Sequence, residues 1–204
     1  MRTQPQEIIA KLEADNSRLA KESVIQSAME EGLDEFFVGL RMALDPLVTF
    51  GVKQVPERSD VLTGQGLSWD NFETLANQLI NRELTGHAAR DAIELAMGVA
   101  TTEQWNGFYR RILIKDLRCG VSEKTVNKIA KKFPQYAIPI FTCPLAHDSA
   151  NHEKKMVGNK QVEVKLDGVR VITVIQGDTS HGKASRVEMF SRNGKQFHNF
   201  GHII

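Results

Sequence analysis

Apolar side chains recur at helical spacing through most of the first 135 residues. Residues three and four positions apart lie on one face of an α-helix, so a stripe of this kind predicts a helix that packs on a core. The aromatic residues in these stripes are expected to pack in that core. Five stripes occur, over residues 33–44, 72–80, 89–96, 105–117 and 126–133.

Polar residues that can cap a helix stand near the start of three stripes. Asp70, with Glu73 three residues later, predicts a capping pair for the second stripe. Thr101 or Thr102 would cap the fourth helix, and Ser122 would cap the fifth. These residues predict where the helices begin.

The pattern changes after Pro134. Pro134, Pro139 and Pro144 interrupt the sequence at short intervals, which is typical of an extended linker. Beyond residue 160 β-branched residues dominate, and Asp167-Gly168 and the polar segment 177–182 favour turns. The strands predicted by this pattern cover residues 161–165, 169–175 and 186–190.

Together these patterns predict an α+β protein with two domains. Residues 1–135 would form an all-α domain, and residues 136–160 a proline-containing linker. Residues 161–204 would form an antiparallel β-rich region. Different elements grouped in separate parts of the chain are typical of this fold class.

Composition excludes several classes of protein. The chain has 204 residues, of which 41% are hydrophobic and 25% charged, as in ordinary globular proteins. No run approaches the roughly 18 apolar residues of a membrane helix, and the N-terminus lacks the apolar segment of a secretory signal. We therefore expect a soluble cytoplasmic protein that does not bind membranes.

Cysteine and histidine offer little chemistry. Two cysteines, Cys119 and Cys143, exclude a disulfide framework and a four-cysteine zinc site. The histidine pairs 147/152 and 198/202 lie in sequence without helical character, so we expect no metal site there. Cys119 could be reactive beside Arg118, but we expect a partly buried structural thiol.

Charge is nearly balanced in total and unevenly placed. The net charge is +1, yet residues 1–102 hold 9 basic and 16 acidic residues, whereas residues 103–135 hold 8 and 3. A basic stretch behind an acidic half is a pattern that suits binding to a polyanion. A solvated helix face would give the same composition, so charge alone does not decide between them.

The segment Lys165-Leu-Asp-Gly-Val-Arg170 lies between two predicted strands. An apolar strand before the lysine and an arginine after it both lower the pKa of the amine from about 10.4, which favours a nucleophile. Next to phosphate-binding arginines, such an amine suits attack on phosphorus to give a phosphoramidate. From the residues alone, an exposed lysine in a surface turn is the alternative.

The segment resembles the first motif of the covalent nucleotidyltransferases, which include ATP-dependent DNA ligases, RNA ligases and mRNA capping enzymes. Ser191-Arg-Asn-Gly194 is similar to the Ser-Arg-x-Gly motif of DNA ligases. Residues 84–89, 115–122 and 127–128 resemble the DNA-binding domain of these ligases. The likeness covers nearly the whole chain and is closest to the small ligases of T-even bacteriophages.

The resemblance implies that residues 161–204 are the incomplete N-terminal part of an adenylation domain, which forms a lysyl-AMP intermediate. Lys165 would take AMP from ATP, in the presence of Mg²⁺, and pass it to the 5′-phosphate of a nick, where the 3′-hydroxyl displaces it. Glu163 would accept a hydrogen bond from the adenine amino group, and Asp167 would orient the turn and the nucleotide or metal. The residues implied to bind the nucleotide are Glu163, Leu166, Arg170 and Arg192.

The resemblance also implies that the helical domain binds nicked duplex DNA. Backbone N–H groups at helix starts can meet phosphates, and basic side chains add an attraction that falls with salt. The glycines can also cap helices, and the two uses are compatible. The implied DNA-binding residues are Gly86, Arg118, Gly120, Ser122, Lys124 and Lys128.

Later motifs of the family are not found after Lys195. These are an acidic residue in a strand, a Glu-Gly segment with a following lysine, and a closing Lys-x-Lys. We therefore expect the N-terminal part of a ligase, inactive alone and from a split gene or a truncated product, which a C-terminal fragment could complete.

Two other functions stay open. The chain could be a non-catalytic module that binds nicked DNA, or part of an RNA ligase or capping enzyme. A ligase would serve DNA replication, repair and recombination, in the host cytoplasm if the protein is viral.

Overall fold

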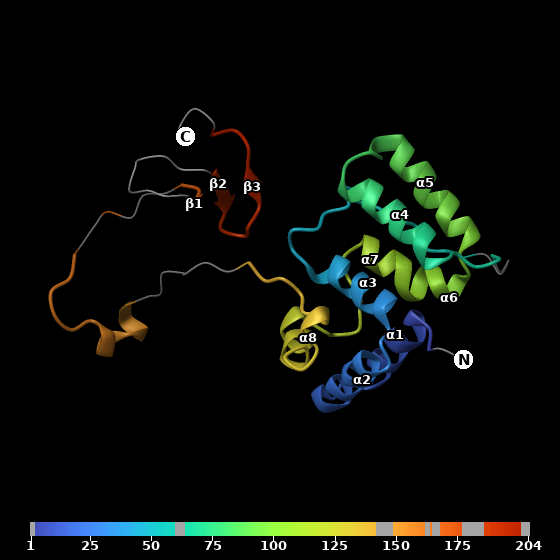
Figure 1. The fold of residues 1–204 in the computed structure, drawn as a ribbon, viewed down its shortest axis with the longest axis horizontal. Coiled ribbons are helices and arrows are strands. Elements are labelled where there is room, and N and C mark those ends of the chain that lie inside the picture. Colours follow the sequence, from blue (N-terminus) through green and yellow to red (C-terminus); the bar gives the residue numbers. More distant parts are fainter. Residues whose placement is uncertain are drawn as a thin grey trace. The chain divides into compact units, whose positions relative to one another are not determined.

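A computed structural model describes most of the chain, in two compact units, Met1–Ile140 and Phe141–Ile204. The first unit is helical, and the second contains a small sheet (Figure 1). These units confirm the predicted α+β fold class. The described residues are 3–59, 64–141, 149–161, 164, 168–176 and 186–200.

The helices of the first unit include all five predicted stripes, at least in part. Two further helices, α1 and α2, precede the first stripe and extend the bundle with their own buried faces. None of the helices in the described part of the chain is long and apolar enough to cross a membrane. The elements are α1 (Pro5–Ala14), α2 (Arg18–Glu30), α3 (Asp34–Leu44), α4 (Trp69–Ile80), α5 (Gly86–Val99), α6 (Thr102–Gln104), the π-helical turn η1 (Trp105–Tyr109), α7 (Arg110–Leu113), α8 (Glu123–Ile129) and the 3₁₀ turn η2 (Pro134–Tyr136).

Two predicted helix starts are confirmed. Thr101 is the N-cap of α6, and its hydroxyl accepts a hydrogen bond from the Gln104 backbone N–H at 3.2 Å. The Gln104 side chain accepts from the Thr101 N–H at 3.1 Å, which completes a capping box. Ser122 is the N-cap of α8.

The capping pair predicted at Asp70 and Glu73 is wrong. Ser68 is the N-cap of α4, and its hydroxyl accepts from the Asn71 N–H at 3.4 Å. Asp70 lies inside the first turn, where its charge favours the positive helix end. The Glu73 carboxylate instead accepts from the indole N–H of Trp69 at 3.1 Å, a contact that no capping pattern indicates.

The core of the first unit is largely aromatic. Phe36 stacks on Phe108 with ring centroids 6.0 Å apart, and Phe72 stacks on Tyr109 at 4.3 Å. All four side chains are buried, which confirms the packing role predicted for the aromatic residues. Burial raises the pKa of Tyr109 to about 12, and its hydroxyl donates to the Leu67 carbonyl at 3.0 Å.

The helical unit runs to Ile140, whereas the proline pattern placed the start of the linker at residue 136. Asn127 explains the difference, because its amide donates to the Ile138 carbonyl at 2.9 Å and accepts from the Ile138 N–H at 2.8 Å. Tyr136 stacks on Phe37 with centroids 4.3 Å apart and donates to Asp34 at 2.7 Å. These tertiary contacts hold residues 136–140 on the helices.

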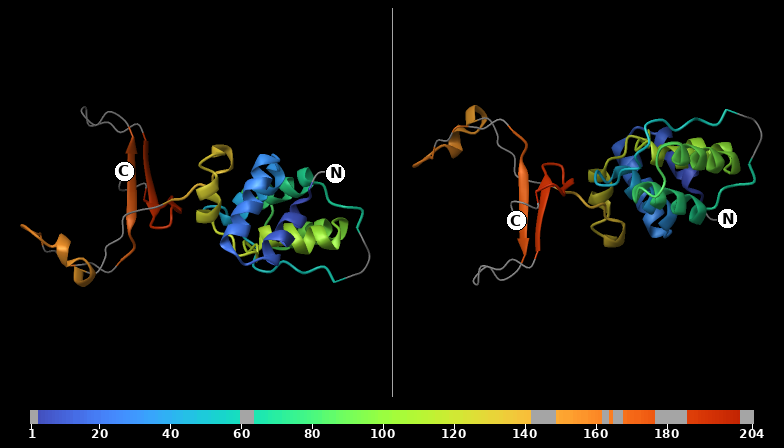
Figure 2. Two further views of the ribbon diagram at one scale, coloured as in Figure 1. Left: turned by 90° about the horizontal axis from the view of Figure 1, so that it is seen from below. Right: turned by 90° about the horizontal axis from the view of Figure 1, so that it is seen from above.

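The second unit contains an antiparallel sheet in the order β1-β2-β3. Both views in Figure 2 show β1 and β2 side by side. Strands were predicted over 169–175 and 186–190, and β1 and β2 occupy these regions; the prediction over 161–165 falls mostly outside the described residues. The elements are the 3₁₀ turns η3 (Ser149–Asn151) and η4 (Glu153–Lys155), and the strands β1 (Val171–Gln176), β2 (Arg186–Ser191) and β3 (Gln196–Phe197).

Two glycines give a matched test of the helical core. A Cβ at Gly39 in α3 would lie 2.5 Å from Phe108 Cζ and 2.7 Å from Ile112 Cδ1, whereas a Cβ at Gly98 in α5 would meet nothing within 4 Å. We expect Gly39→Ala to lower the free energy of unfolding by about 1–3 kcal/mol through overpacking. Gly98→Ala should raise it by about 0.5–1 kcal/mol. Urea unfolding measures both, and equal effects would contradict the close approach at Gly39.

Candidate active site and nucleic-acid interface

The nucleotide-binding residues implied by the resemblance are only partly described. Lys165, Glu163, Leu166 and Asp167 lie outside the described residues, so their roles stay predictions. Arg170 and Arg192 are described, and both are exposed.

The two arginines flank the last residue pair of the β1–β2 ladder. Val171 of β1 pairs with Ser191 of β2; Arg170 directly precedes Val171, and Arg192 directly follows Ser191 in the turn after β2. Planar guanidinium groups match the geometry of phosphate. Arg170 and Arg192 are therefore the described candidates for phosphate binding at this end of the sheet.

The Ser191-Arg-Asn-Gly194 segment is the turn between β2 and β3. The Ser191 N–H donates to the Lys195 carbonyl at 2.7 Å, and the Gly194 N–H donates to the Ser191 carbonyl at 2.9 Å. The Ser191 hydroxyl accepts from the Lys195 N–H at 3.0 Å. Gly194 has φ +82°, the left-handed conformation that closes a three-residue hairpin loop.

The turn explains the residue types of the motif. The serine and the glycine build the loop, and Phe141 covers Gly194 so closely that a Cβ there would lie 2.5 Å from its Cγ. Arg192 and Asn193 are exposed at the tip. The motif therefore presents Arg192 from a fixed backbone.

A glycine substitution tests this account. We expect Gly194→Ala to speed hydrogen exchange of the Ser191 amide at least tenfold, since φ +82° and the contact with Phe141 both oppose a side chain. Asn193→Ala is the control at the exposed neighbouring position, and it should leave the exchange rate unchanged. NMR-detected exchange in the full chain measures both variants, and equal rates in the two would refute the role given to Gly194.

The implied DNA-binding residues come from two parts of the helical unit. Gly86 begins α5, which packs against α4, and has φ +55°. The other five lie on residues 118–128, a segment that ends in α8, which packs against α2. In this segment Arg118 and Gly120 have φ +54° and +64°, and Ser122 caps the helix.

The two lysines of α8 differ in their partners. Lys128 Nζ lies 2.6 and 2.8 Å from the two carboxylate oxygens of Glu22. Lys128, and then Arg18, lower the pKa of Glu22, so this carboxylate stays charged and neutralises Lys128. Lys124 is exposed, and no ion pair within the described ranges involves it. Lys124 is therefore the better placed of the two to meet a phosphate.

Arg118 is held loosely. Its guanidinium lies 3.7 Å from Glu57 and 3.9 Å from Asp116, and about half of the side chain is exposed. Exposed ion pairs of this length contribute little to stability. Arg118 can therefore exchange these carboxylates for a phosphate at low cost.

Lys21 adds a charge that the sequence analysis missed. Its side chain is buried, and a Cβ at Gly120 would lie 2.7 Å from Lys21 Nζ. The ammonium group therefore lies against the backbone of Gly120. The lysine falls in the acidic first part of the chain, where no local pattern indicates this contact.

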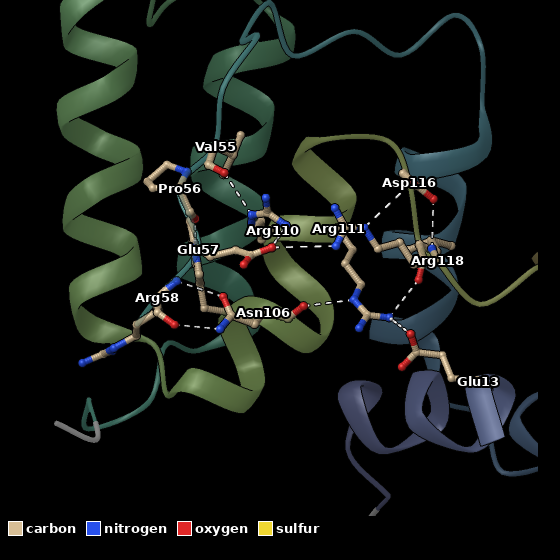
Figure 3. A network of polar contacts seen from close by, with 12 residues as sticks. Glu13, Val55, Pro56, Glu57, Arg58, Asn106, Arg110, Arg111, Asp116 and Arg118 are labelled. Carbon is tan, nitrogen blue, oxygen red and sulfur yellow. Dashed lines mark hydrogen bonds and ion pairs between the residues drawn. The ribbon is translucent and has the colours of Figure 1, made fainter. Parts of the chain in front are cut away.

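Other basic residues of the stretch 103–135 serve the fold (Figure 3). Arg110 donates to the Val55 carbonyl at 2.9 Å and pairs with Glu57 at 2.9 Å. Arg111 bridges η1 to α1, because it donates to the Asn106 carbonyl at 2.9 Å and pairs with Glu13 at 2.8 Å.

Lys115 is structural as well. Its Nζ donates to the carbonyls of Met42 and Asp45 at 3.0 and 2.6 Å, and burial lowers its pKa. The basic stretch is thus partly internal, and the charge available to a polyanion is smaller than the sequence indicates.

Cysteine and metal chemistry find no support in the described part of the molecule. Cys119 is buried and burial raises the pKa of its thiol, which confirms the predicted structural thiol. The residues that the structure describes contain no group of three or more metal-binding side chains.

Comparison with known proteins points to one class of enzyme. No family model matches the chain, and no curated protein sequence does. Two solved structures of a Prochlorococcus marinus ligase, titled Pmar-Lig_PreS3 and Pmar-Lig_Pre., match it with TM-scores of 0.86 and 0.87 and sequence identities of 68% and 67%. The chain resembles the N-terminal part of a ligase. Each match covers 100% of this chain and 45% of the ligase, so the chain spans less than half of the ligase's length.

Proposed function

We propose that this chain is the N-terminal portion of an ATP-dependent DNA ligase, which seals nicks in duplex DNA through a lysyl-AMP intermediate. The observation that carries the proposal is the 68% identity with a ligase across the whole chain. The Lys165–Arg170 motif supports it, because ATP-dependent ligation needs a nucleophilic lysine beside phosphate ligands. The relation to ligases of T-even bacteriophages stays a prediction from the resemblance.

Lys165 is the proposed nucleophile. Its neutral Nζ attacks the α-phosphorus of ATP, so that an N–P bond forms, the bond to pyrophosphate breaks and Nζ loses a proton. The positive charge of Arg170, five residues away, favours the neutral amine. Arg170 and Arg192, which flank the paired residues Val171 and Ser191, would stabilise charge on the phosphoryl oxygens.

The remaining nucleotide contacts come from residues beside the lysine. Glu163 would accept from the adenine amino group, Leu166 would line the nucleotide, and Asp167 would orient the turn. Mg²⁺ bound with ATP would supply neutralisation of the phosphate charge.

The helical unit would hold the nicked duplex. Exposed cations such as Lys124 and Arg118 attract phosphates at any sequence, which suits an enzyme that acts at any nick. AMP then passes from Lys165 to the 5′-phosphate, and the 3′-hydroxyl displaces it as the new phosphodiester forms. The proposed roles are in DNA replication, repair and recombination.

Covalent labelling tests the nucleophile. The chain, joined to the remainder of the Pmar-Lig sequence in place of its matching part, should take a covalent AMP label from radiolabelled ATP and Mg²⁺. Lys165→Ala should abolish the label, and Lys160→Ala, an exposed lysine on the same segment, should retain it. Label that survives Lys165→Ala would reject the nucleophile. No label in the unmodified chimera, together with DNA binding, would favour a non-catalytic DNA-binding module.

DNA binding gives a second test. We expect Lys124→Ala to weaken binding of the full chain to nicked duplex about tenfold. The slope of the logarithm of the binding constant against the logarithm of the salt concentration should fall by the share of about one phosphate contact. Lys128→Ala should cost less, because Glu22 already neutralises Lys128. Fluorescence anisotropy at several salt concentrations measures both variants. A larger loss for Lys128→Ala would show that the ion pair with Glu22 does not persist on DNA.

A further inference from the structure

The end of α4 has an unusual residue in a common helix-ending motif. The Arg82 N–H donates to the Leu79 carbonyl at 3.2 Å, and the Glu83 N–H donates to the Gln78 carbonyl at 2.9 Å. These two bonds define a Schellman motif, and Arg82 occupies its left-handed position with φ +64°. Glycine is usual there, because a residue with a Cβ pays a conformational cost in this region.

The same motif occurs at two other helix ends. α2 ends with glycine in the left-handed position, Gly32, as expected. α7 ends with Lys115, whose Nζ donates to the carbonyls of Met42 in α3 and of Asp45, the C-cap of α3. Where a lysine replaces glycine at such an end, its side chain therefore makes contacts that glycine cannot make.

The guanidinium of Arg82 lies over Gly51. A Cβ at Gly51 would overlap the Nη1 atom of Arg82 and lie 2.6 Å from its Cζ. Gly51 has φ +71°, and its bare backbone therefore forms the surface on which the guanidinium rests. Arg82 Nη2 donates to the Thr49 hydroxyl at 3.5 Å.

Arg82 keeps its charge available. It is exposed, and none of the ion pairs between described residues includes it, whereas Arg18, Arg110, Arg111 and Arg118 each pair with a carboxylate. The adjacent Glu83 carboxylate accepts from the Asn81 side chain at 3.4 Å. A guanidinium can bind a phosphate in a two-pronged contact.

Neighbouring groups favour the same ligand. Figure 1 shows the segment after α3 running past the turn that joins α4 to α5. Thr49 offers a hydroxyl there, and Lys53, two residues after Gly51, is exposed. The turn leads within four residues to Gly86, which the resemblance to DNA ligases assigns to DNA binding.

We propose that Arg82, seated on Gly51 beside Thr49, is a binding residue for a backbone phosphodiester of duplex DNA. The identity of the ligand rests on the proposed function, and the position of the guanidinium does not. Arg82 lies at the C-terminal end of α4, so its charge would also interact with the helix dipole. Comparing the stability and the DNA affinity of Arg82 variants separates this interaction from phosphate binding.

The decisive variant is Arg82→Gly in the full chain. Glycine keeps the left-handed conformation, so the urea midpoint should stay the same or rise. Affinity for nicked duplex should fall about tenfold, and the salt dependence should drop by about one phosphate contact. Arg82→Lys, which keeps the charge without the planar fork, should lose part of the affinity. Arg41→Ala removes another exposed arginine and should leave binding unchanged.

Each result has one meaning. Arg82→Gly that binds like the wild type, with the same salt dependence, overturns the proposal. A lower urea midpoint with unchanged binding shows a purely structural role and also overturns it. If Arg82→Gly fails to fold, Arg82→Asn, which also tolerates the left-handed region, provides the same binding comparison. A wild-type chain that does not bind nicked duplex contradicts the proposed DNA-binding function, which is a separate failure.

Discussion

The helical unit depends on one close approach, between the α3 backbone at Gly39 and the side chains of Phe108 and Ile112. Phe108 lies in the π-helical turn η1, whose residues Trp105, Phe108 and Tyr109 are all buried in the core. A larger residue at Gly39 would push η1 and α7 outward. The segment after α7 carries Arg118, Gly120 and Ser122, so the position of the candidate DNA contacts follows from this packing.

Some basic side chains of this protein hold the fold together, and others are exposed to solvent. Arg110 and Lys115 donate to backbone carbonyls of distant segments, at Val55 and at Met42 and Asp45, and so help to hold the irregular segment 45–68 and its start. Arg58 has a similar role from that segment, since its backbone exchanges hydrogen bonds with Asn106 at 3.0 and 2.9 Å. Only cations outside such networks can exchange water for phosphate without cost to the fold.

The sequence was sufficient where a local pattern decides the structure. The stripes located α3, α4 and α5, and Thr101 and Ser122 marked two helix starts, because helical periodicity and N-capping act within a few residues.

Other features depend on contacts that the patterns do not indicate. Ser68, not Asp70, is the N-cap of α4, and Glu73 bonds to Trp69. Asn127 binds the backbone of Ile138 across eleven residues and so holds residues after 135 on the helices. The contact of Arg82 with Gly51 joins two segments that no sequence pattern connects.

The two candidate sites use arginine in physically different ways. In the sheet, Arg170 and Arg192 are far apart in sequence, and they flank Val171 and Ser191, which the hairpin register pairs. The Ser191 and Gly194 loop bonds then fix the backbone that carries Arg192, so the serine and glycine of the motif act through geometry. In the helical unit, a glycine from one segment seats an arginine from another. In both cases the glycine has positive φ and a close neighbour, so a residue with a Cβ would disturb the segment that positions the arginine.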